Sequence, residues 1–323
     1  MTAARTALQT QINPRWVDSD SYVAFLNRVF PGQWDRGAYD WYMARDFNGV
    51  KSDLLVRAEG DRILAGMVIG SRQIRVGAGG PIDVCIVSAA ATLPGERRRG
   101  HYAALLQTAL EYSRQKGCVA LLGFVTRDNG SGRELMRLGS RAIPSFYILS
   151  GARARIRHGL HPRATLTTSI AQRPVALESV LACWERQVAP SDPSIGPAAH
   201  FYYGRVEDWK RQFLHRPHSV RAVRLAHDSL ALVESVRSTD RMQWLGCPGA
   251  KTVRNIVALA AGSATAGRQF FMYTLDSLLA AAARRVGLKV RDGYLMALPT
   301  GHSRGAWDEL ARASWSVQSG DRI

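Results

Sequence analysis

The chain has 323 residues, of which 46% are hydrophobic and 21% are charged. These values are typical of a soluble globular protein, and they exclude a disordered chain, a collagen, a coiled coil and a disulfide scaffold. The length predicts two domains, because single hydrophobic cores stop growing beyond about 250–300 residues. No apolar run reaches the roughly 18–20 residues needed to span a bilayer, and residues 1–16 are too polar for a secretory signal. We therefore expect a cytoplasmic protein with no membrane partner.

The 43 basic and 26 acidic residues give a formal net charge of +17. Such an excess attracts polyanions, which makes phosphate-bearing cofactors and nucleic acids the natural partners. A coding bias toward arginine would produce the same excess without any function. The four cysteines and eight histidines show no spacing typical of zinc ligands, so we expect no metal cofactor.

The first half of the chain predicts alternating helices and strands. Aromatic residues at helical spacing in 17–47 predict two short helices that face a common core. Two β-rich runs, 53–58 and 63–71, predict a hairpin. A nearly uncharged run at 82–93 predicts a central strand buried on both faces. The remaining elements predicted in this half are a helix at 101–116, a strand at 119–125, a short helix at 132–138 and a strand at 145–149.

Residues 151–323 predict a repeat of this order of elements. Glu207-Asp208-Trp209 resembles Tyr39-Asp40-Trp41 in the first half, although such residues can also recur by chance. We therefore divide the chain into domains at 1–150 and 151–323. The elements predicted in the second half are strands at 219–225, 230–236, 242–245, 269–274 and 290–298, and helices at 253–261 and 277–286.

The segment between the central strand and the helix at 101–116 carries the clearest indication of function. Three arginines, Arg97, Arg98 and Arg99, precede Gly100 at the start of this helix. A strand that leads through a tight turn into a helix presents unpaired backbone N–H groups and the positive end of the helix dipole at one point. Glycine permits close approach of the backbone, and arginines can neutralise a pyrophosphate. We expect an anion site here; the alternative is a solvated basic turn.

The sequence Arg97-Arg98-Arg99-Gly100-His101-Tyr102-Ala103 resembles the R/QxxGxG/A loop of the GCN5-related N-acetyltransferase (GNAT) superfamily, which holds the pyrophosphate of acetyl-CoA. The resemblance covers about residues 14–150. It implies that Thr92 and Leu93 offer backbone groups to the pantetheine arm, and that Asn129 corresponds to an asparagine of the family. It also implies a mixed α/β fold, in which a mixed central sheet is flanked by helices.

The second half lacks the arginine-glycine loop. At the corresponding place it has Cys247-Pro248-Gly249-Ala250-Lys251-Thr252, with a single lysine. The whole chain is therefore similar to tandem members of the superfamily, in which two acetyltransferase-like domains follow each other. The resemblance implies that the second domain is degenerate.

The sequence departs from the family pattern at residues that carry the chemistry. Tyr102 stands where the loop has a small residue, which would place an aromatic ring beside the phosphates. Many members have a glutamate base on the central strand and a tyrosine acid on the last helix, but the corresponding residues here are Ile86 and Leu135. Asp83 is the nearest acid and our candidate for the catalytic base, acting through a water; capping of the preceding turn is its alternative role. Weaker alternatives are Ser88, Cys85 and Tyr147.

The resemblance implies an N-acyltransferase that moves an acetyl or other small acyl group from an acyl-CoA to a small amine, which binds in a cleft between the halves. The alternative is an enzyme of the same fold that takes an aminoacyl group from charged tRNA. Arg153, Arg155 and Arg157 lie on one face of an extended chain and would suit an RNA backbone, although a charged edge strand or linker has the same pattern. A third possibility is a non-catalytic module that binds nucleic acid or senses CoA.

Overall fold

A computed structural model of the protein describes residues 8–44, 46–47, 49–150, 173–174, 177–188, 198–225, 229–246 and 252–322. The arginine stripe predicted at Arg153, Arg155 and Arg157 lies outside the described residues. So does most of the segment 247–252 that replaces the arginine-glycine loop in the second half.

The first half confirms the predicted order of elements. Helix α1 begins at a capping box, in which Asp18 and Ser21 satisfy each other's backbone N–H groups. Helix α3 ends before Gly117, whose left-handed backbone (φ +75°) favours glycine. The elements of this half are β1 (Thr10–Ile12), α1 (Ser19–Val29), α2 (Arg36–Ala44), β2 (Asp46–Phe47), β3 (Val50–Lys51), β4 (Asp53–Glu59), β5 (Arg62–Val76), β6 (Pro81–Thr92), the 3-10 turn η1 (Pro94–Glu96), α3 (His101–Gln115), β7 (Ala120–Thr126), α4 (Gly130–Arg137) and β8 (Arg141–Ser150).

The second half contains the predicted strands and helices together with several that were not predicted, among them α6, β10 and α10. Its elements are β9 (Arg173–Pro174), α6 (Leu177–Val188), β10 (Ala198–Tyr202), α7 (Val206–Phe213), β11 (Val220–Arg224), β12 (Leu230–Val236), β13 (Thr239–Gly246), α8 (Thr252–Thr265), β14 (Gln269–Thr274), α9 (Ser277–Arg285), β15 (Lys289–Pro299), α10 (Arg304–Arg312), β16 (Ser314–Ser316) and η3 (Ser319–Arg322).

Apart from β2 and β3, which pair only with each other, the strands of the described residues join into one mixed sheet. Its main path runs β1-β4-β5-β6-β7-β15-β8-β14-β13-β12-β11-β9, while β10 pairs with β5 and β16 pairs with β10. Most neighbouring strands are antiparallel, but β6 and β7 are parallel, as are β13 and β14. The predicted class, a mixed sheet flanked by helices, is confirmed. The division of the chain at residue 150 stays a prediction.

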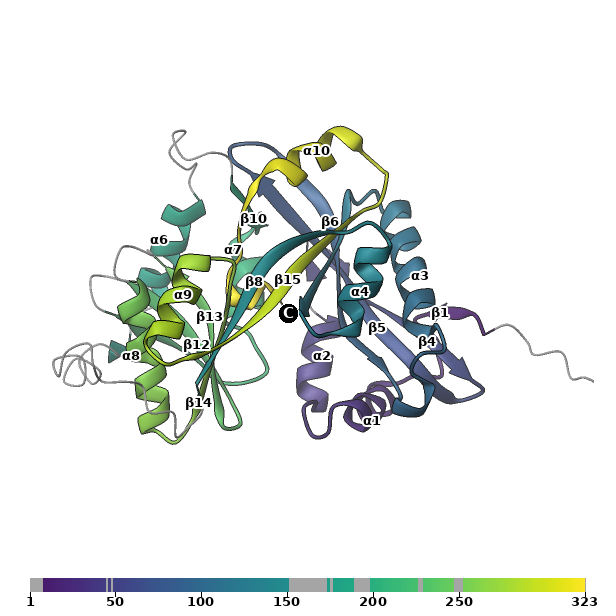
Figure 1. The fold of residues 1–323 in the computed structure, drawn as a ribbon, viewed down its shortest axis with the longest axis horizontal. Helices are drawn as coiled ribbons and strands as arrows, with labels where there is room; N and C mark the ends of the chain where they lie inside the picture. Colours follow the sequence, from purple (N-terminus) through teal and green to yellow (C-terminus); the bar gives the residue numbers. More distant parts are fainter. Residues whose placement is uncertain are drawn as a thin grey trace, which may run out of the picture.

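The two halves exchange their last long strands. β15 of the second half pairs with β7 of the first half, and β8 of the first half pairs with β14 of the second half. Between them, β8 and β15 pair with each other from Lys289–Leu149 to Ala297–Arg141. Figure 1 shows both strands crossing from one half to the other. A large contact surface therefore joins the halves.

Helices cover both faces of the sheet in the first half. Helix α3 buries Leu105, Leu106 and Ala109 against one face, and α1 and α2 place aromatic rings, including that of Tyr22, against the other. The close approach of Tyr22 explains Gly66 in β5, since a Cβ there would lie 2.6 Å from the Tyr22 hydroxyl. In the second half, α8 and α9 cover the sheet with their own apolar cluster. Among the described residues, no helix has both the length and the hydropathy that crossing a membrane requires.

Candidate active site

Strands β6 and β7 separate where the central sheet meets the arginine loop. They pair only from Val84–Ala120 to Val87–Gly123, although β6 continues to Thr92 and β7 to Thr126. The edge of β6 that faces β7 therefore has no partner strand beyond Val87 among the described residues. Such an open strand edge can bind an extended ligand through its backbone N–H and C=O groups.

A β-bulge in β6 lies within this open stretch. Val68 of β5 opposes Ser88, whereas Gly66 opposes Ala91, so two residues of β6 stand opposite Met67 alone. Ala89, one of these two, has a left-handed backbone (φ +47°). A bulge of this kind re-aims the strand and is frequent next to active sites. The carboxyl end of β6 is thus bent toward the gap beside β7.

The predicted anion loop is a turn with two left-handed residues. Arg98 has φ +67° and Gly100 has φ +79°, and Gly100 is the N-cap of α3. No atom lies within 4 Å of the position that a Cβ on Gly100 would take. Arg97, Arg98 and Arg99, which directly precede Gly100, are exposed. The first N–H groups of α3 and a basic turn thus adjoin an open space at Gly100.

Glu96 organises this loop, and the sequence analysis missed it. Its carboxylate is buried and forms ion pairs with Arg99 (2.9 Å) and with Arg62 of the β4–β5 hairpin (3.0 Å). The side chain of Arg97 donates to the carbonyl oxygen of Thr92 at 3.5 Å. One carboxylate therefore positions two arginines and leaves a net positive charge. The sequence indication was an acid three residues before Arg99, a spacing typical of ion pairs within a turn.

The next two residues of the motif point inward. His101 is buried, and its Nδ1 accepts a hydrogen bond from Arg57 Nε (3.3 Å). Burial, together with the charge of Arg57, lowers the pKa of His101. The ring of Tyr102 packs against the core under α3 and lines the cavity described below. Burial raises the pKa of Tyr102 to about 12, while a hydrogen bond with Ser131 opposes this effect. Tyr102 is therefore a neutral phenol at physiological pH.

The other predicted ligand residues surround the loop. Thr92 is half-buried at the end of β6, and Ala103 is half-buried in the first turn of α3. Leu93 is buried and its N–H donates to Leu64 O at 2.9 Å. Asn129 caps α4, where its side chain accepts from Ser131 N (3.0 Å), and it lines the cavity.

The structure does not bring Asp83 to these residues. Asp83 lies near the beginning of β6, exposed, and accepts a hydrogen bond from Gln73 Nε2 at 3.0 Å. It is not among the residues that line the cavity. Of the weaker alternatives, Ser88 lines the cavity, whereas Cys85 is buried with its Sγ 3.4 Å from that of Cys118.

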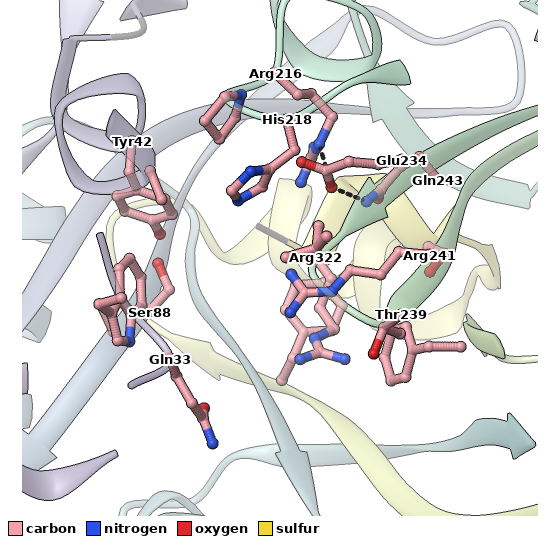
Figure 2. Close-up of a pocket in the computed structure, with 18 of the residues that line it drawn as sticks. Gln33, Tyr42, Ser88, Arg216, His218, Glu234, Thr239, Arg241, Gln243 and Arg322 are labelled. Atoms are coloured by element: carbon pink, nitrogen blue, oxygen red, sulfur yellow. Dashed lines mark hydrogen bonds and ion pairs between the residues drawn. The ribbon is translucent and has the colours of Figure 1, made fainter. Parts of the chain in front are cut away.

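A cavity of about 670 Å³ lies between the two halves. Residues of α2, β6, β7 and α4 line its first-half side, and residues of β12, β13, β14 and η3 line the opposite side. Figure 2 shows Gln33, Tyr42 and Ser88 on one side of this space and Arg241 and Arg322 on the other. The cavity thus begins at the open edge of β6 and extends to the second half.

The second-half wall is rich in arginine. Four arginines and one carboxylate are among the described lining residues: Arg216, Arg237, Arg241, Arg322 and Glu234. Glu234 pairs with Arg216 Nε (3.0 Å) and accepts from Gln243 Nε2 (2.5 Å). The guanidinium of Arg216 also lies over the ring of Trp41 of the first half, 4.7 Å from its centroid. The wall keeps an excess of positive charge after this ion pair.

One histidine lines the described part of the cavity. His218 follows Arg216 in the connection between α7 and β11, and its Nε2 lies 3.8 Å from the Asp35 carboxylate of the first half. Asp35 itself accepts a hydrogen bond from Ala38 N (2.7 Å) at the start of α2. A carboxylate of the first half therefore faces an imidazole of the second.

The corresponding gap in the second half is filled by the protein. β13 and β14 pair only from Thr239–Gln269 to Arg241–Phe271 and then separate. The segment around η3 lies between them, because Gln318 bonds to both backbone groups of Leu245 and Ser319 Oγ accepts from Tyr273 N (3.1 Å). These bonds occupy the edges of β13 and β14. The corresponding edge of β6 in the first half remains open.

A buried carboxyl anchors η3. Asp321 accepts hydrogen bonds from the Tyr203 hydroxyl (2.5 Å) and from Gln318 N (2.7 Å). Burial raises the pKa of Asp321 to about 7, although both hydrogen bonds and the charge of Arg72 act in the opposite direction. This segment carries the side chain of Arg322 into the cavity.

Metal ligands do not cluster in the described part of the chain, where no group of three or more His, Cys, Asp or Glu side chains is arranged to hold an ion. The candidate site consists of the basic turn at the start of α3, the open edge of β6 and the cavity between the halves.

Comparisons with known proteins agree with this geometry. The family described as acetyltransferase (GNAT) domain matches residues 16–127. No curated protein sequence matches the chain. Among solved structures, a tandem GNAT protein from the clavulanic acid biosynthesis pathway is similar, with a TM-score of 0.56 and 13% identity, over 91% of this chain and 100% of that one.

Two further structures have the same fold. A probable N-acyltransferase from Enterococcus faecalis has a TM-score of 0.55 at 10% identity, over 90% of this chain and 72% of that one. A GCN5-related N-acetyltransferase from Kribbella flavida has a TM-score of 0.52 at 15% identity, over 90% of this chain and 71% of that one. Residues 16–127 therefore match the acetyltransferase (GNAT) domain family, and the chain as a whole has the fold of tandem GNAT proteins.

Proposed function

We propose that the protein transfers an acetyl or other small acyl group from an acyl-CoA to a small amine, with a single donor site in the first half. The observation that carries this proposal is the open space at Gly100, at the start of α3 and directly after three exposed arginines. Such a helix N-terminus is suited to a pyrophosphate. The bulged, unpaired edge of β6 leads from this point to the cavity.

The path of the donor follows from these features. With the pyrophosphate at the start of α3, the pantetheine arm would lie along the free edge of β6 between Ser88 and Thr92 and bond to its backbone groups. The thioester would then reach the gap between β6 and β7, where Ser88 and Tyr102 line the cavity. The acceptor amine would approach from the second half.

The reaction joins the amine nitrogen to the acyl carbon, and the carbon–sulfur bond breaks. The amine loses one proton, and the departing sulfur of CoA gains one. Among the described lining residues, His218 is best placed to accept the proton of the amine, because Glu234 is engaged by Arg216 and Gln243. The phenol of Tyr102 stays protonated and can donate a hydrogen bond to the thioester oxygen or the departing sulfur.

The second half serves as a wall rather than as a second donor site. The segment around η3 occupies the gap between β13 and β14 that corresponds to the open gap of the first half. This arrangement supports a single acyl-CoA per chain and a degenerate second domain. With the donor bound as proposed, second-half residues would lie opposite the thioester.

The donor assignment is tested by isothermal titration with CoA. The double substitution Arg97→Ala and Arg99→Ala should weaken CoA binding more than tenfold, since charge-assisted hydrogen bonds to phosphate are worth about 1.5–3 kcal/mol each. The matched control replaces two exposed arginines of the second half, Arg254 and Arg285, by alanine, and so removes the same charge. Equal weakening in both double variants, or unchanged CoA affinity in the first, would contradict the proposed donor site.

A further inference from the structure

The arginines in the second-half wall of the cavity differ in how they are paired. The guanidinium of Arg216 forms an ion pair with Glu234 and lies over the ring of Trp41. Arg241 lies opposite Glu234 in the β12–β13 ladder, but no carboxylate of the described residues lies within ion-pair distance of its guanidinium. Burial lowers the pKa of Arg241, and the charges of Arg322, Arg216 and Arg237 act in the same direction, while the charge of Glu234 opposes them.

Aromatic rings hold Arg322 in place, and no carboxylate of the described residues forms an ion pair with it. Its guanidinium lies against three aromatic rings, with centroids 4.9 Å (Tyr147), 5.3 Å (Phe271) and 6.0 Å (Tyr273) away. Its Nη1 is buried, and none of the described residues accepts a hydrogen bond from it. The bonds of Gln318 and Asp321 fix the turn that carries it. The side chain is thus ordered by packing while one of its donors lacks an acceptor.

A buried guanidinium donor without an acceptor is unusual in proteins, because the lost hydrogen bond is costly. Here that donor belongs to a residue that lines the cavity, and Arg241 lies beside it (Figure 2). Two guanidinium forks from β13 and η3 therefore face the same space. The missing acceptor of Arg322 is best supplied by a ligand in the cavity, which Arg241 also lines, and guanidinium forks match the oxygens of a carboxylate or a phosphate.

We propose that Arg241 and Arg322 bind an oxyanion of the acceptor, so that the acceptor is an amine that also carries a carboxylate or a phosphate. This inference rests on the acyltransferase function proposed above and names the substrate class of the same cavity. The same excess of positive charge repels polyamines and other cationic acceptors. Planar two-oxygen geometry favours the carboxylate, which makes amino acids the first candidates.

The test compares amines in matched pairs. Glycine is compared with glycinamide, glutamate with its diamide, and O-phosphoethanolamine with ethanolamine, while spermidine represents the cationic class. Release of the CoA thiol from acetyl-CoA and from longer acyl-CoAs gives kcat/KM for each amine. A change in melting temperature on adding each amine gives a second readout that needs no turnover. We expect the anionic member of at least one pair to exceed its neutral partner by about tenfold to a hundredfold.

In Arg241→Gln and Arg322→Gln, the ratio of kcat/KM for the anionic amine to that for its neutral partner should fall close to one. Arg322→Lys keeps the charge but loses the two-pronged geometry of the guanidinium, so it should retain only part of the preference for anionic amines. Arg285→Gln, an exposed arginine of α9, is the control and should keep the full preference. The melting temperature of each variant without ligand separates misfolding from lost recognition. If the carboxylate pairs show the preference and the phosphate pair does not, the oxyanion is a carboxylate; the reverse result assigns a phosphate.

The outcomes distinguish this inference from the proposed function. Equal acylation of neutral and anionic amines by an enzyme that binds CoA would overturn the inference and leave the function intact. A preference that persists in both glutamine variants, or anionic amines that neither react nor stabilise the protein better than neutral ones, would also overturn it. Absence of CoA binding would refute the proposed function, while stabilisation by anionic amines would still report on the two arginines.

Discussion

Replacing Gly100 by alanine adds a Cβ at the point where we place the pyrophosphate. The left-handed backbone of Gly100 (φ +79°) costs an L-residue about 1–2 kcal/mol. No clash within the protein adds to this cost, because no atom lies within 4 Å of the new Cβ. For a chain of this size the loss should lower Tm by about 2–6 °C.

The effect on the ligand should exceed this backbone strain. A methyl group in front of α3 would push a phosphate away from at least one helix N–H group, and a hydrogen bond to a charged group is worth about 1.5–3 kcal/mol. We therefore expect the Kd for CoA, measured by isothermal titration, to rise about tenfold to a hundredfold.

A matched glycine separates the two effects. Gly267, at the end of α8, has a left-handed backbone (φ +70°) and no atom within 4 Å of its Cβ position. Gly267→Ala should lower Tm by a similar amount and leave the affinity for CoA unchanged. If both variants bind CoA as tightly as the parent, the space in front of Gly100 does not hold the pyrophosphate.

Three further predictions concern other parts of the molecule. Because the pKa of Asp321 is raised to about 7, ionisation of this carboxyl lowers the stability of the folded state as pH rises from about 4 to 7. The difference in unfolding free energy between Asp321→Asn and the parent, measured in urea, should therefore grow by roughly 3 kcal/mol from pH 5 to pH 8. A difference that does not change with pH would contradict this. Gly293→Ala should lower the stability by about 1–3 kcal/mol or more, seen as a lower Tm, because its Cβ would lie 2.6 Å from Val125 O in the neighbouring strand. His218→Gln should reduce kcat about a hundredfold while the KM for acyl-CoA stays the same. If Asp83→Asn shows a loss of this size and His218→Gln does not, the residue that accepts the proton of the amine is Asp83, as first predicted from the sequence.

Local patterns predicted most of the elements and the basic turn before α3; the binding of an anion at this turn stays a prediction. The run 82–93 predicted β6, and apolar spacing predicted α3, since both patterns depend only on which faces are buried. The turn at Arg97–Gly100 was recognisable because a basic turn between a strand and a helix has a chemistry of its own. The orientation of Tyr102 was harder to predict. The sequence suggested a ring beside the phosphates, whereas in the structure the ring packs under α3 and lines the cavity.

The remaining features depend on contacts between distant segments. The apolar residues of β15 fit a strand equally well beside β14 or beside β7, so the local pattern contains no information on the exchange. The positions of Arg322 and of Asp321 depend on how η3 enters the gap between β13 and β14. His218 and Asp35 are far apart in the chain, and only the closure of the two halves brings them together.

The exchange of β8 and β15 has a consequence for how such a chain could arise or be redesigned. Excising the second half would remove β15, one of the two neighbours of β7, and leave β8 without the strands on either side of it. The first half therefore needs the second to complete its own sheet, whether or not the second half binds a cofactor. Under the function proposed above, the second half binds no donor, and its arginines are available to select the acceptor.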